Sequence, residues 1–343
     1  MKTTFKAAVL FKQHKDLEII ELNFPQKLSK GQVLVKLISA AICGAQIGEI
    51  KGIKGKDKWL PHCMGHEGYG KVIKKHSSVK KLKVNDKVIM HWRKGKGINA
   101  ETFKYTDSKN RIINSGNITT FQEYSVVSEN RLSKANNLKE IKIGPLLGCA
   151  VPTAWGILAK ETQFKKNHSL LIFGAGGVGL TIAILGKIMG SKNIYLVDKF
   201  KSKKRLIKKF NLNFLNLKQI RDNKIKFDRV IDTTGSTKII SEAFNKVQKN
   251  GYLVLVGQPK KGSTLKIFDP LKLFNAPSDN IKIISSDGGL FNPEEDMKKI
   301  LKMVIKNKFF FENLITHTFN IKDVNKGINL IQKGKTGRVG LIF

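Results

Sequence analysis

An uncharged stretch in the middle of the chain, SLLIFGAGGVGLTIAILG (residues 169–186), constrains the fold more than any other segment. Its length approaches that of a membrane-spanning helix, but four glycines within six positions would interrupt a continuous helix. A short buried strand, a tight turn and a second element fit the same residues. We therefore predict a strand, a turn and a helix in a globular chain, and no membrane segment.

The turn in this stretch, GAGGVG, has the spacing of a dinucleotide-binding loop. Gly174 would permit the tight turn, Gly176 would let the backbone approach a pyrophosphate, and Gly179 would allow close packing of the helix on the strand. Unpaired N–H groups at the helix N-terminus would bind the phosphate. The predicted cofactor-binding residues of the loop are Gly174, Gly176, Gly177, Val178 and Gly179. The alternative is a glycine-rich turn that binds nothing.

An acidic residue ends the next predicted strand, NIYLVD, 19 residues after Gly179. At that position the Asp198 carboxylate can bind the ribose hydroxyls of a dinucleotide. Because the same carboxylate should repel a 2′-phosphate, we favour NAD over NADP. Five basic residues follow, and we expect them to form a solvated helix face, although one of them could accept a phosphate. They are Lys199, Lys201, Lys203, Lys204 and Arg205.

The rest of the chain divides into two patterns. Short alternating segments such as FKAAVLF, QVLVKLIS and GYGKVIKK fill the first 150 residues, with turn residues between them. Beyond residue 150, strands alternate with helical segments of about 10 to 15 residues, which is typical of a parallel sheet with crossover helices. We therefore predict an α/β fold in which a mostly-β domain accompanies a doubly wound parallel sheet of the Rossmann type.

A formal net charge of +37 raises the question of nucleic-acid binding. Lysine supplies nearly all of the positive charge, and only seven residues are arginine, the residue that reads bases with a bidentate fork. No helix-turn-helix, zinc-finger or aromatic RNA-binding signature accompanies the charge. We predict no nucleic-acid partner, whereas an anionic small substrate is compatible with the composition.

The three cysteines, Cys43, Cys63 and Cys149, are too few and too scattered for a disulfide framework. An odd number of thiols favours a reducing compartment. The N-terminal apolar run is also shorter than a secretory signal needs. We therefore expect a cytoplasmic protein.

Three separate stretches contain residue types that bind zinc. ICGAQIGEI contains Cys43, PHCMGHEGYGKV contains His66 and Glu67, and GPLLGCAVPTAWG contains Cys149. A catalytic zinc takes about three protein ligands of the N, S or O type and leaves one position open. Judged singly, each of these side chains could instead be packed in a core.

Taken together, these motifs resemble the zinc-dependent medium-chain alcohol dehydrogenase family. The resemblance includes GHEGYGKV, NDKVIM, TTFQEYSVV, LLGCAVPTAWG, GAGGVGL and GYLVLVG in the same order, and the C-terminal tail. It implies a GroES-like catalytic domain over residues 1–149, an NAD-binding domain over 150–286 and a return to the catalytic domain over 287–343. It also implies an oxidoreductase that transfers a hydride between NAD and an alcohol, polyol or sugar-type hydroxyl, assembled as a dimer or tetramer.

By this resemblance, Cys43, His66 and Cys149 would ligate one catalytic zinc, with Glu67 as a nearby or alternate ligand. Zinc would act as a Lewis acid on the substrate oxygen. Many members bind a second, structural zinc through four closely spaced cysteines, but this chain has no cysteine between Cys63 and Cys149. We expect one zinc per chain and treat Cys63 as a packed thiol.

The chain departs from the family at the residues that relay the substrate proton. Ala45 and Gly48 stand where a hydroxyl and a histidine are common, and neither can carry a proton. Gln46 replaces the acid that orients the ligating histidine, and its amide oxygen could still orient the ring. Proton transfer would then use ordered water or one of three side chains, His91, Glu49 and His62. We favour His91 because it adjoins the expected substrate pocket.

The resemblance also implies roles around the cofactor and the substrate. Thr153 would touch the nicotinamide, Arg338 would reach the pyrophosphate, and Trp92 would line the substrate pocket. The loop HWRKGKG adds three cations beside this pocket, which are Arg93, Lys94 and Lys96. We hypothesise that they recognise an anionic or sugar-phosphate-like substrate, the alternative being a solvated loop.

Two other functional classes stay open. A zinc-free reductase of the same superfamily would lack the Cys43, His66 and Cys149 set. A non-catalytic nucleotide-binding protein is conceivable because the usual relay is lost, but such a protein would have no need to keep all three ligands.

Overall fold

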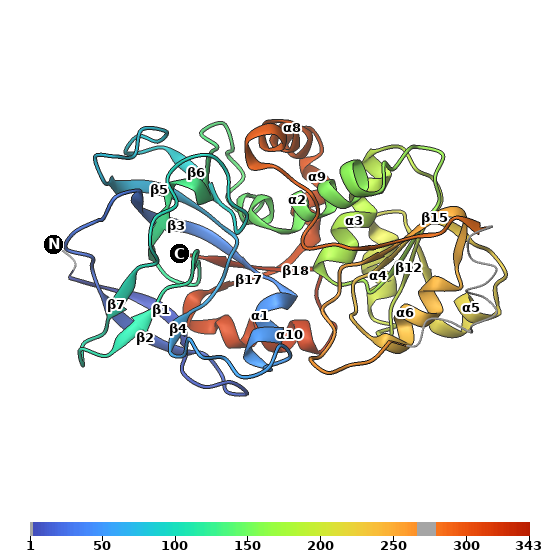
Figure 1. Ribbon diagram of the computed structural model, residues 1–343, viewed down its shortest axis with the longest axis horizontal. Helices are drawn as coiled ribbons and strands as arrows, with labels where there is room; N and C mark the ends of the chain where they lie inside the picture. The colour runs from blue at the N-terminus through green and yellow to red at the C-terminus, as the bar shows by residue number, and fades with distance from the viewer. Residues whose placement is uncertain (1–2, 266–278) are drawn as a thin grey trace. The chain divides into compact units, whose positions relative to one another are not determined.

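The computed structural model describes residues 3–265 and 279–343 (Figure 1). The chain folds into two compact units. The first unit contains Met1–Ala150, Asn292–Lys333 and Arg338–Phe343, and the second contains Val151–Phe291 and Gly334–Gly337. The chain therefore leaves the first unit near residue 150 and returns to it near residue 292.

Two sheets build the first unit. The strands of the first sheet are β1 (Thr4–Leu10), β2 (Glu18–Asn23), β4 (His62–Cys63), β7 (Lys104–Thr106) and β8 (Ile112–Asn114), in the order β2-β1-β4-β8-β7. The strands of the second sheet are β3 (Gln32–Ile42), β5 (Gly68–Lys75), β6 (Lys87–Met90), β9 (Tyr124–Ser128), β10 (Leu132–Lys134), β17 (Ile315–Asn320) and β18 (Arg338–Ile342). Their order is β10-β6-β5-β3-β18-β17, and β9 pairs with β3. The prediction of a mostly-β domain is confirmed.

Strand β3 is central because nearly every residue of its apolar run, QVLVKLISAAI, is buried. It pairs antiparallel with β5, where Ala40 lies opposite Gly68, and with β18, where Ile42 lies opposite Val339. Side chains of β3 enter three separate hydrophobic clusters of the first unit. This register brings the end of β3 and the start of β5 to the same edge of the sheet.

A short hairpin occupies the segment that lacks cysteines. Strands β7 and β8 pair antiparallel, and Asp107 holds the turn between them. Its carboxylate accepts the backbone N–H groups of Lys109 and Arg111, both at 2.9 Å, and the Arg111 side chain at 2.7 Å. The turn is thus fixed by hydrogen bonds, which the sequence pattern did not predict.

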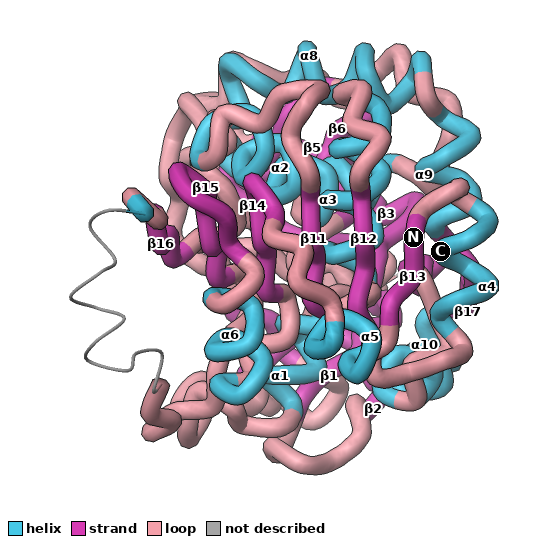
Figure 2. The backbone as a smooth tube through the Cα atoms, turned by 90° about the vertical axis from the view of Figure 1, so that its right-hand side faces the viewer, coloured by secondary structure: helices cyan, strands magenta, loops and turns pink. Residues whose placement is uncertain are grey.

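A parallel sheet forms the centre of the second unit. Its strands are β11 (Leu170–Phe173), β12 (Ile194–Val197), β13 (Asn213–Leu215), β14 (Phe227–Asp232), β15 (Val247–Leu255) and β16 (Lys282–Ser285). They lie side by side in the order β13-β12-β11-β14-β15-β16, and each neighbouring pair is parallel (Figure 2). This order reverses direction between β11 and β14, as in a doubly wound Rossmann sheet. The Rossmann prediction is confirmed.

The helices complete each unit. Among the described residues, the α-helices of the second unit are α2 (Ala150–Trp155), which begins at the boundary, α3 (Gly177–Ile188), α4 (Lys203–Lys209), α5 (Leu217–Asp222) and α6 (Thr237–Phe244). Those of the first unit are α1 (Gly44–Ile50), α8 (Pro293–Lys306), α9 (Lys308–Leu314) and α10 (Val324–Gln332). Strand β11 and helix α3 are the strand and helix expected on either side of the glycine turn.

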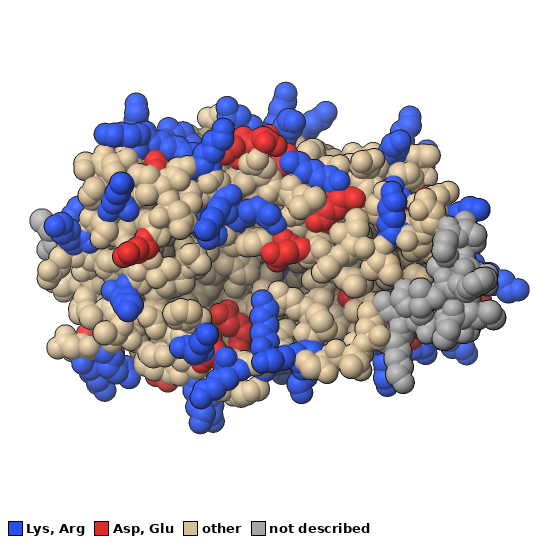
Figure 3. Space-filling model, in the orientation of Figure 1, with Lys and Arg blue, Asp and Glu red and all other residues tan. Residues whose placement is uncertain are grey.

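Basic side chains are scattered over the face drawn in Figure 3 and do not gather there into one continuous stripe. Acidic side chains stand among them on the same face. Within residues 3–265 and 279–343, none of the helices combines the length and the apolar character that a bilayer crossing requires.

Candidate functional site

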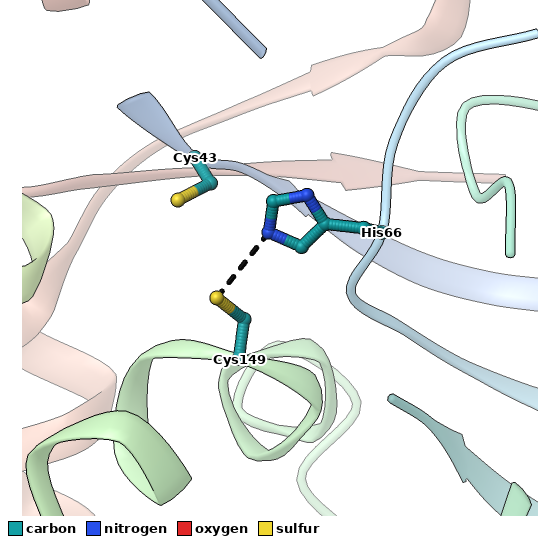
Figure 4. Close-up of side chains that lie close together, drawn as sticks. All are labelled: Cys43, His66 and Cys149. Carbon is teal, nitrogen blue, oxygen red and sulfur yellow. Dashed lines mark hydrogen bonds between the residues drawn. The ribbon is translucent and has the colours of Figure 1, made fainter. Parts of the chain in front are cut away.

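Cys43, His66 and Cys149 lie together in the first unit, with one donor atom of each within 4.8 Å of the others. Figure 4 shows the two thiols and the imidazole pointing toward one another. The Nε2 atom of His66 lies 3.2 Å from the Cys149 sulfur. Donors around one tetrahedral zinc stand roughly 3.5 to 4 Å apart. The donor set and its spacing therefore fit zinc.

The backbone explains why residues so distant in sequence converge. Cys43 follows β3 directly and precedes α1, while His66 comes two residues before β5, which pairs with β3. Cys149 directly follows a 3-10 helix, Gly144–Gly148, that packs on this sheet. A Cβ atom on Gly148 would lie 2.3 Å from the carbonyl oxygen of Met90. Only glycine permits this approach, which brings Cys149 against the sheet.

Electrostatics at the cluster favour one ionised thiol. The pKa of Cys43 lies well below its ordinary value because Cys149 donates a hydrogen bond to it, and His66 and Arg338 add further attraction against the effect of burial. The same hydrogen bond raises the pKa of Cys149. A cation bound between the sulfurs would replace this shared proton, since thiolates are the metal-binding form.

Glu67 forms a buried ion pair with Arg338. The carboxylate is completely buried, the arginine is 2% exposed, and Nη2 of Arg338 donates to Oε1 of Glu67. The second oxygen, Oε2, has no hydrogen-bond partner. Burial raises the pKa of Glu67 to about 7, although the arginine opposes the shift. The role of Glu67 as a nearby or alternate metal ligand therefore stays a prediction. The expected contact of Arg338 with the cofactor pyrophosphate stays a prediction as well.

Gln46 contacts the imidazole of His66 from α1. Its amide nitrogen, rather than the oxygen expected from the sequence, faces Nδ1 of His66. The reason is that the amide oxygen accepts the backbone N–H of Cys43 at 3.2 Å. Gln46 therefore links the first two members of the cluster and fixes the ring.

Cys63 lies outside the cluster. Its thiol is 2% exposed and packs with Phe5, Tyr105 and Val126 in a hydrophobic cluster. Burial raises the pKa of this thiol. It has the surroundings expected of a packed, unreactive cysteine.

The glycine loop of the second unit joins β11 to α3. Gly174 has φ of +96°, the left-handed region that favours glycine, and Gly176 caps the helix with φ of −77°. A Cβ atom on Gly179 would lie 1.9 Å from the carbonyl oxygen of Gly174, whereas one on Gly176 would meet nothing within 4 Å. The loop therefore has a closely packed side and an open side.

Asp198 lies at the end of β12 beside this loop. Its carboxylate accepts the N–H of Ala175 at 2.7 Å and the N–H of Phe200 at 2.8 Å. It also lines a cavity of about 420 Å³ together with Gly174. The carboxylate thus ties the loop to the next strand and also lines the cavity beside it.

Thr153 and His91 are both buried. Thr153 lies in α2 and is 4% exposed. His91 has no exposed surface, and its two ring nitrogens contact the Arg93 carbonyl oxygen at 2.6 Å and the Ser133 hydroxyl at 3.0 Å. Burial lowers the pKa of His91 to about 4. The structure therefore does not favour His91 as a proton carrier.

A second group of titratable side chains is better placed to carry a proton. Nε2 of His62 lies 2.8 Å from Asp57 and 3.7 Å from Glu49. Both carboxylate residues line a cavity of about 430 Å³ that Ala45 and His66 also line. Sequence reasoning named Glu49 and His62 but missed Asp57, which lies in a lysine-rich loop without a motif.

Trp92 lines a different cavity of the first unit, of about 410 Å³. The guanidinium of Arg93 stacks over its ring at 4.9 Å. Lys94 and Arg131 also line this cavity, but Lys96 does not. Sequence reasoning missed Arg131, because no nearby motif marks it.

Comparisons with known proteins agree with this architecture. Residues 29–137 match the family model described as "Alcohol dehydrogenase GroES-like domain", and residues 154–332 match "Glucose dehydrogenase C-terminus". Alcohol dehydrogenase 1 of Pisum sativum is 27% identical over an alignment that covers 97% of this chain and 95% of that protein.

Solved structures show the same fold. Benzyl alcohol dehydrogenase from Acinetobacter calcoaceticus has a TM-score of 0.86 at 22% identity, with 100% of each chain covered. An "alcohol dehydrogenase zinc-binding domain protein" from Burkholderia ambifaria has a TM-score of 0.88 at 20% identity, with 99% of each chain covered.

Proposed function

Because the chain belongs to the zinc-dependent medium-chain alcohol dehydrogenase family, we propose that it transfers a hydride between an alcohol, polyol or sugar-type hydroxyl and NAD. The observation that carries this proposal is the convergence of Cys43, His66 and Cys149 in the first unit. A non-catalytic relative would have no reason to retain two thiols and an imidazole at the spacing that one zinc requires.

The three side chains would hold one zinc per chain, which supplies Lewis acidity to an alcohol oxygen when bound. Glu67 and Arg338 fill the adjacent buried space with a neutral pair. Gln46 keeps the His66 ring in place from α1. Such positioning matters because the groups around a metal ligand strongly affect its affinity for the metal.

In the second unit, the loop from Gly174 to Gly179 would receive the cofactor pyrophosphate on its open side, at the N-terminus of α3. Asp198 supports NAD over NADP, because a carboxylate at the cavity wall repels a 2′-phosphate. The contact of Thr153 with the nicotinamide, and assembly as a dimer or tetramer, stay predictions.

A substrate and metal screen tests the proposal. Zinc content would be measured by elemental analysis, and turnover of simple alcohols, polyols and sugar phosphates would be followed with NAD and NADP. We expect one zinc per chain and faster turnover with NAD. A metal-free protein that still reduces substrates would indicate the zinc-free reductase, and a zinc-loaded protein without any turnover would indicate the non-catalytic class.

We further propose that Glu49 accepts the substrate proton, in place of the relay that Ala45 and Gly48 cannot provide. Glu49 lines the same cavity as His66 and its side chain is 43% exposed, so it can exchange the proton with water. His62 lies between Glu49 and Asp57, and Nδ1 of its ring donates to the Cys63 carbonyl at 2.9 Å. His62 and Asp57 are positioning residues for this carboxylate.

Replacing Glu49 with glutamine should lower kcat by about a hundredfold. This is the low end of general-base effects, because water can partly replace an exposed carboxylate. The plot of kcat against pH should also no longer show the ionisation of a carboxylate. Glu101→Gln removes an exposed carboxylate outside this cavity and serves as the control. An unchanged rate and pH profile in Glu49→Gln would exclude Glu49 from the relay.

A further inference from the structure

The cavity beside Trp92 is cationic. It has a volume of about 410 Å³, and the residues that line it are Trp92, Arg93, Lys94, Asn117, Ile118 and Arg131. Three of the six carry a positive charge, and none is acidic. Cavities of this size suit small molecules, and this composition suits an anion.

Arg131 is the residue that makes this cavity unusual. It is only 7% exposed, yet its guanidinium has no hydrogen-bond or carboxylate partner within the described parts of the chain, and its Nε is a buried donor without an acceptor. Other buried arginines are paired. Arg338 pairs with Glu67, and Arg229 donates to the carbonyl oxygens of Thr162 and Asp228.

An unpaired buried guanidinium is costly, because desolvation is not offset by a partner. Burial alone lowers the pKa of Arg131. Two acids whose contacts lie in the neighbouring segments are engaged elsewhere. Glu129 accepts the backbone N–H groups of Lys80, Lys81 and Ile98, and Glu294 pairs with Lys81 and accepts the N–H of Lys96. Among the described residues, the positive charge of Arg131 is therefore not neutralised by a carboxylate.

Two segments that line this cavity run beside the chain that contains His66 of the zinc-binding cluster. Met90 on β6 lies opposite Gly68 on β5, so the chain that continues to Trp92 runs beside the chain that contains His66. Asn117 and Ile118 precede Thr120, whose N–H donates to the Met64 carbonyl at 3.0 Å, two residues before His66. Both contacts place residues of the cavity wall beside the segment from Met64 to Gly68, which contains His66.

We propose that this cavity binds an anionic group, a carboxylate or a phosphate ester, that the substrate alcohol carries. The inference rests on the proposed function and narrows its substrate class. Arg131 would form a bidentate pair with the anion, while Lys94 adds charge and the Asn117 amide donates a hydrogen bond. The Trp92 ring, held under Arg93, would pack on the carbon skeleton. The sequence hypothesis is thus corrected in one residue, since Arg131 lines the cavity and Lys96 does not.

The test begins by measuring the binding of inorganic phosphate and of benzoate at constant ionic strength. Thermal shift and calorimetry report the affinity. Arg131→Met removes the charge and keeps the side-chain length. Asn117→Asp is isosteric and adds a competing carboxylate. Each should weaken the affinity for both anions at least tenfold. Lys30→Met removes an exposed charge far outside the lining and should leave the affinity unchanged.

The second part measures turnover of matched alcohols with and without a terminal carboxylate or phosphate. The wild type should prefer the charged member, and the ratio of the two kcat/KM values should fall at least tenfold in Arg131→Met and Asn117→Asp. Inorganic phosphate should compete with the charged alcohol. If Arg131→Met fails to fold, Asn117→Asp decides the outcome.

Two results would overturn the inference. One is equal turnover of neutral and charged alcohols by the wild type, with no binding of phosphate or benzoate. The other is phosphate inhibition that does not compete with the charged alcohol, which would place the anion outside the substrate site. Failure of the proposed function looks different, because the anions would still bind through Arg131 while no alcohol is oxidised with NAD or NADP.

Discussion

Replacing Cys43 with serine is expected to remove zinc from the protein and to abolish most alcohol oxidation. The hydroxyl is a poor zinc ligand compared with a thiolate, and the low pKa of Cys43 makes it the thiol most readily ionised in the cluster. Loss of a residue that only orients a metal ligand costs roughly 10- to 100-fold in metal affinity or activity. Loss of the ligand itself should exceed about 100-fold in kcat/KM on the same scale.

The measurement is zinc per chain after dialysis, together with kcat/KM and a thermal melt. Cys63→Ala is the matched control, because Cys63 is also buried but packs in a separate hydrophobic cluster. We expect it to retain zinc and activity at some cost in stability. A Cys43→Ser protein with full zinc content and wild-type turnover would show that the metal is held elsewhere.

The sequence predicts best those structural elements that residues close together in the chain determine. The strand LLIF, the turn after it and helix α3 follow from one run of apolar residues and glycines, since each element is decided locally. Cys43 could be placed at a strand end for the same reason, because QVLVKLISAAI is buried along nearly its whole length. The cofactor loop and the ends of two key strands were therefore within reach of the sequence.

Residues that act through distant partners could not be predicted in this way. Glu67 and Arg338 pair across 271 positions because β18 returns to lie beside β3, and this pairing is set by sheet order rather than by a local pattern. Asp57 meets His62 through a loop that has no motif. Arg131 looks like an ordinary basic residue until its burial and lack of a partner are known.

Substituting Gly179 with alanine is expected to destabilise the second unit and to abolish NAD binding. Alanine inside a helix normally stabilises by about 0.5–1 kcal/mol relative to glycine. At this position the added Cβ would lie 1.9 Å from the Gly174 carbonyl oxygen and 3.1 Å from its carbon, both backbone atoms that cannot rotate away. Helix α3 must therefore move off β11, at a cost of about 3 kcal/mol, the upper part of the usual range for overpacking.

Gly176→Ala in the same loop tests cofactor binding separately from the packing of helix α3. A Cβ there meets nothing within 4 Å, and φ of −77° suits any residue, so the free energy of unfolding in urea should be unchanged or slightly higher. The methyl group would nevertheless occupy the side open to pyrophosphate, so the affinity for NAD measured by fluorescence titration should fall at least tenfold, by about 1.4 kcal/mol. Wild-type affinity in Gly176→Ala would mean that the pyrophosphate does not lie on this loop. Wild-type stability in Gly179→Ala would mean that the close contact of α3 with the loop is not needed to hold them together.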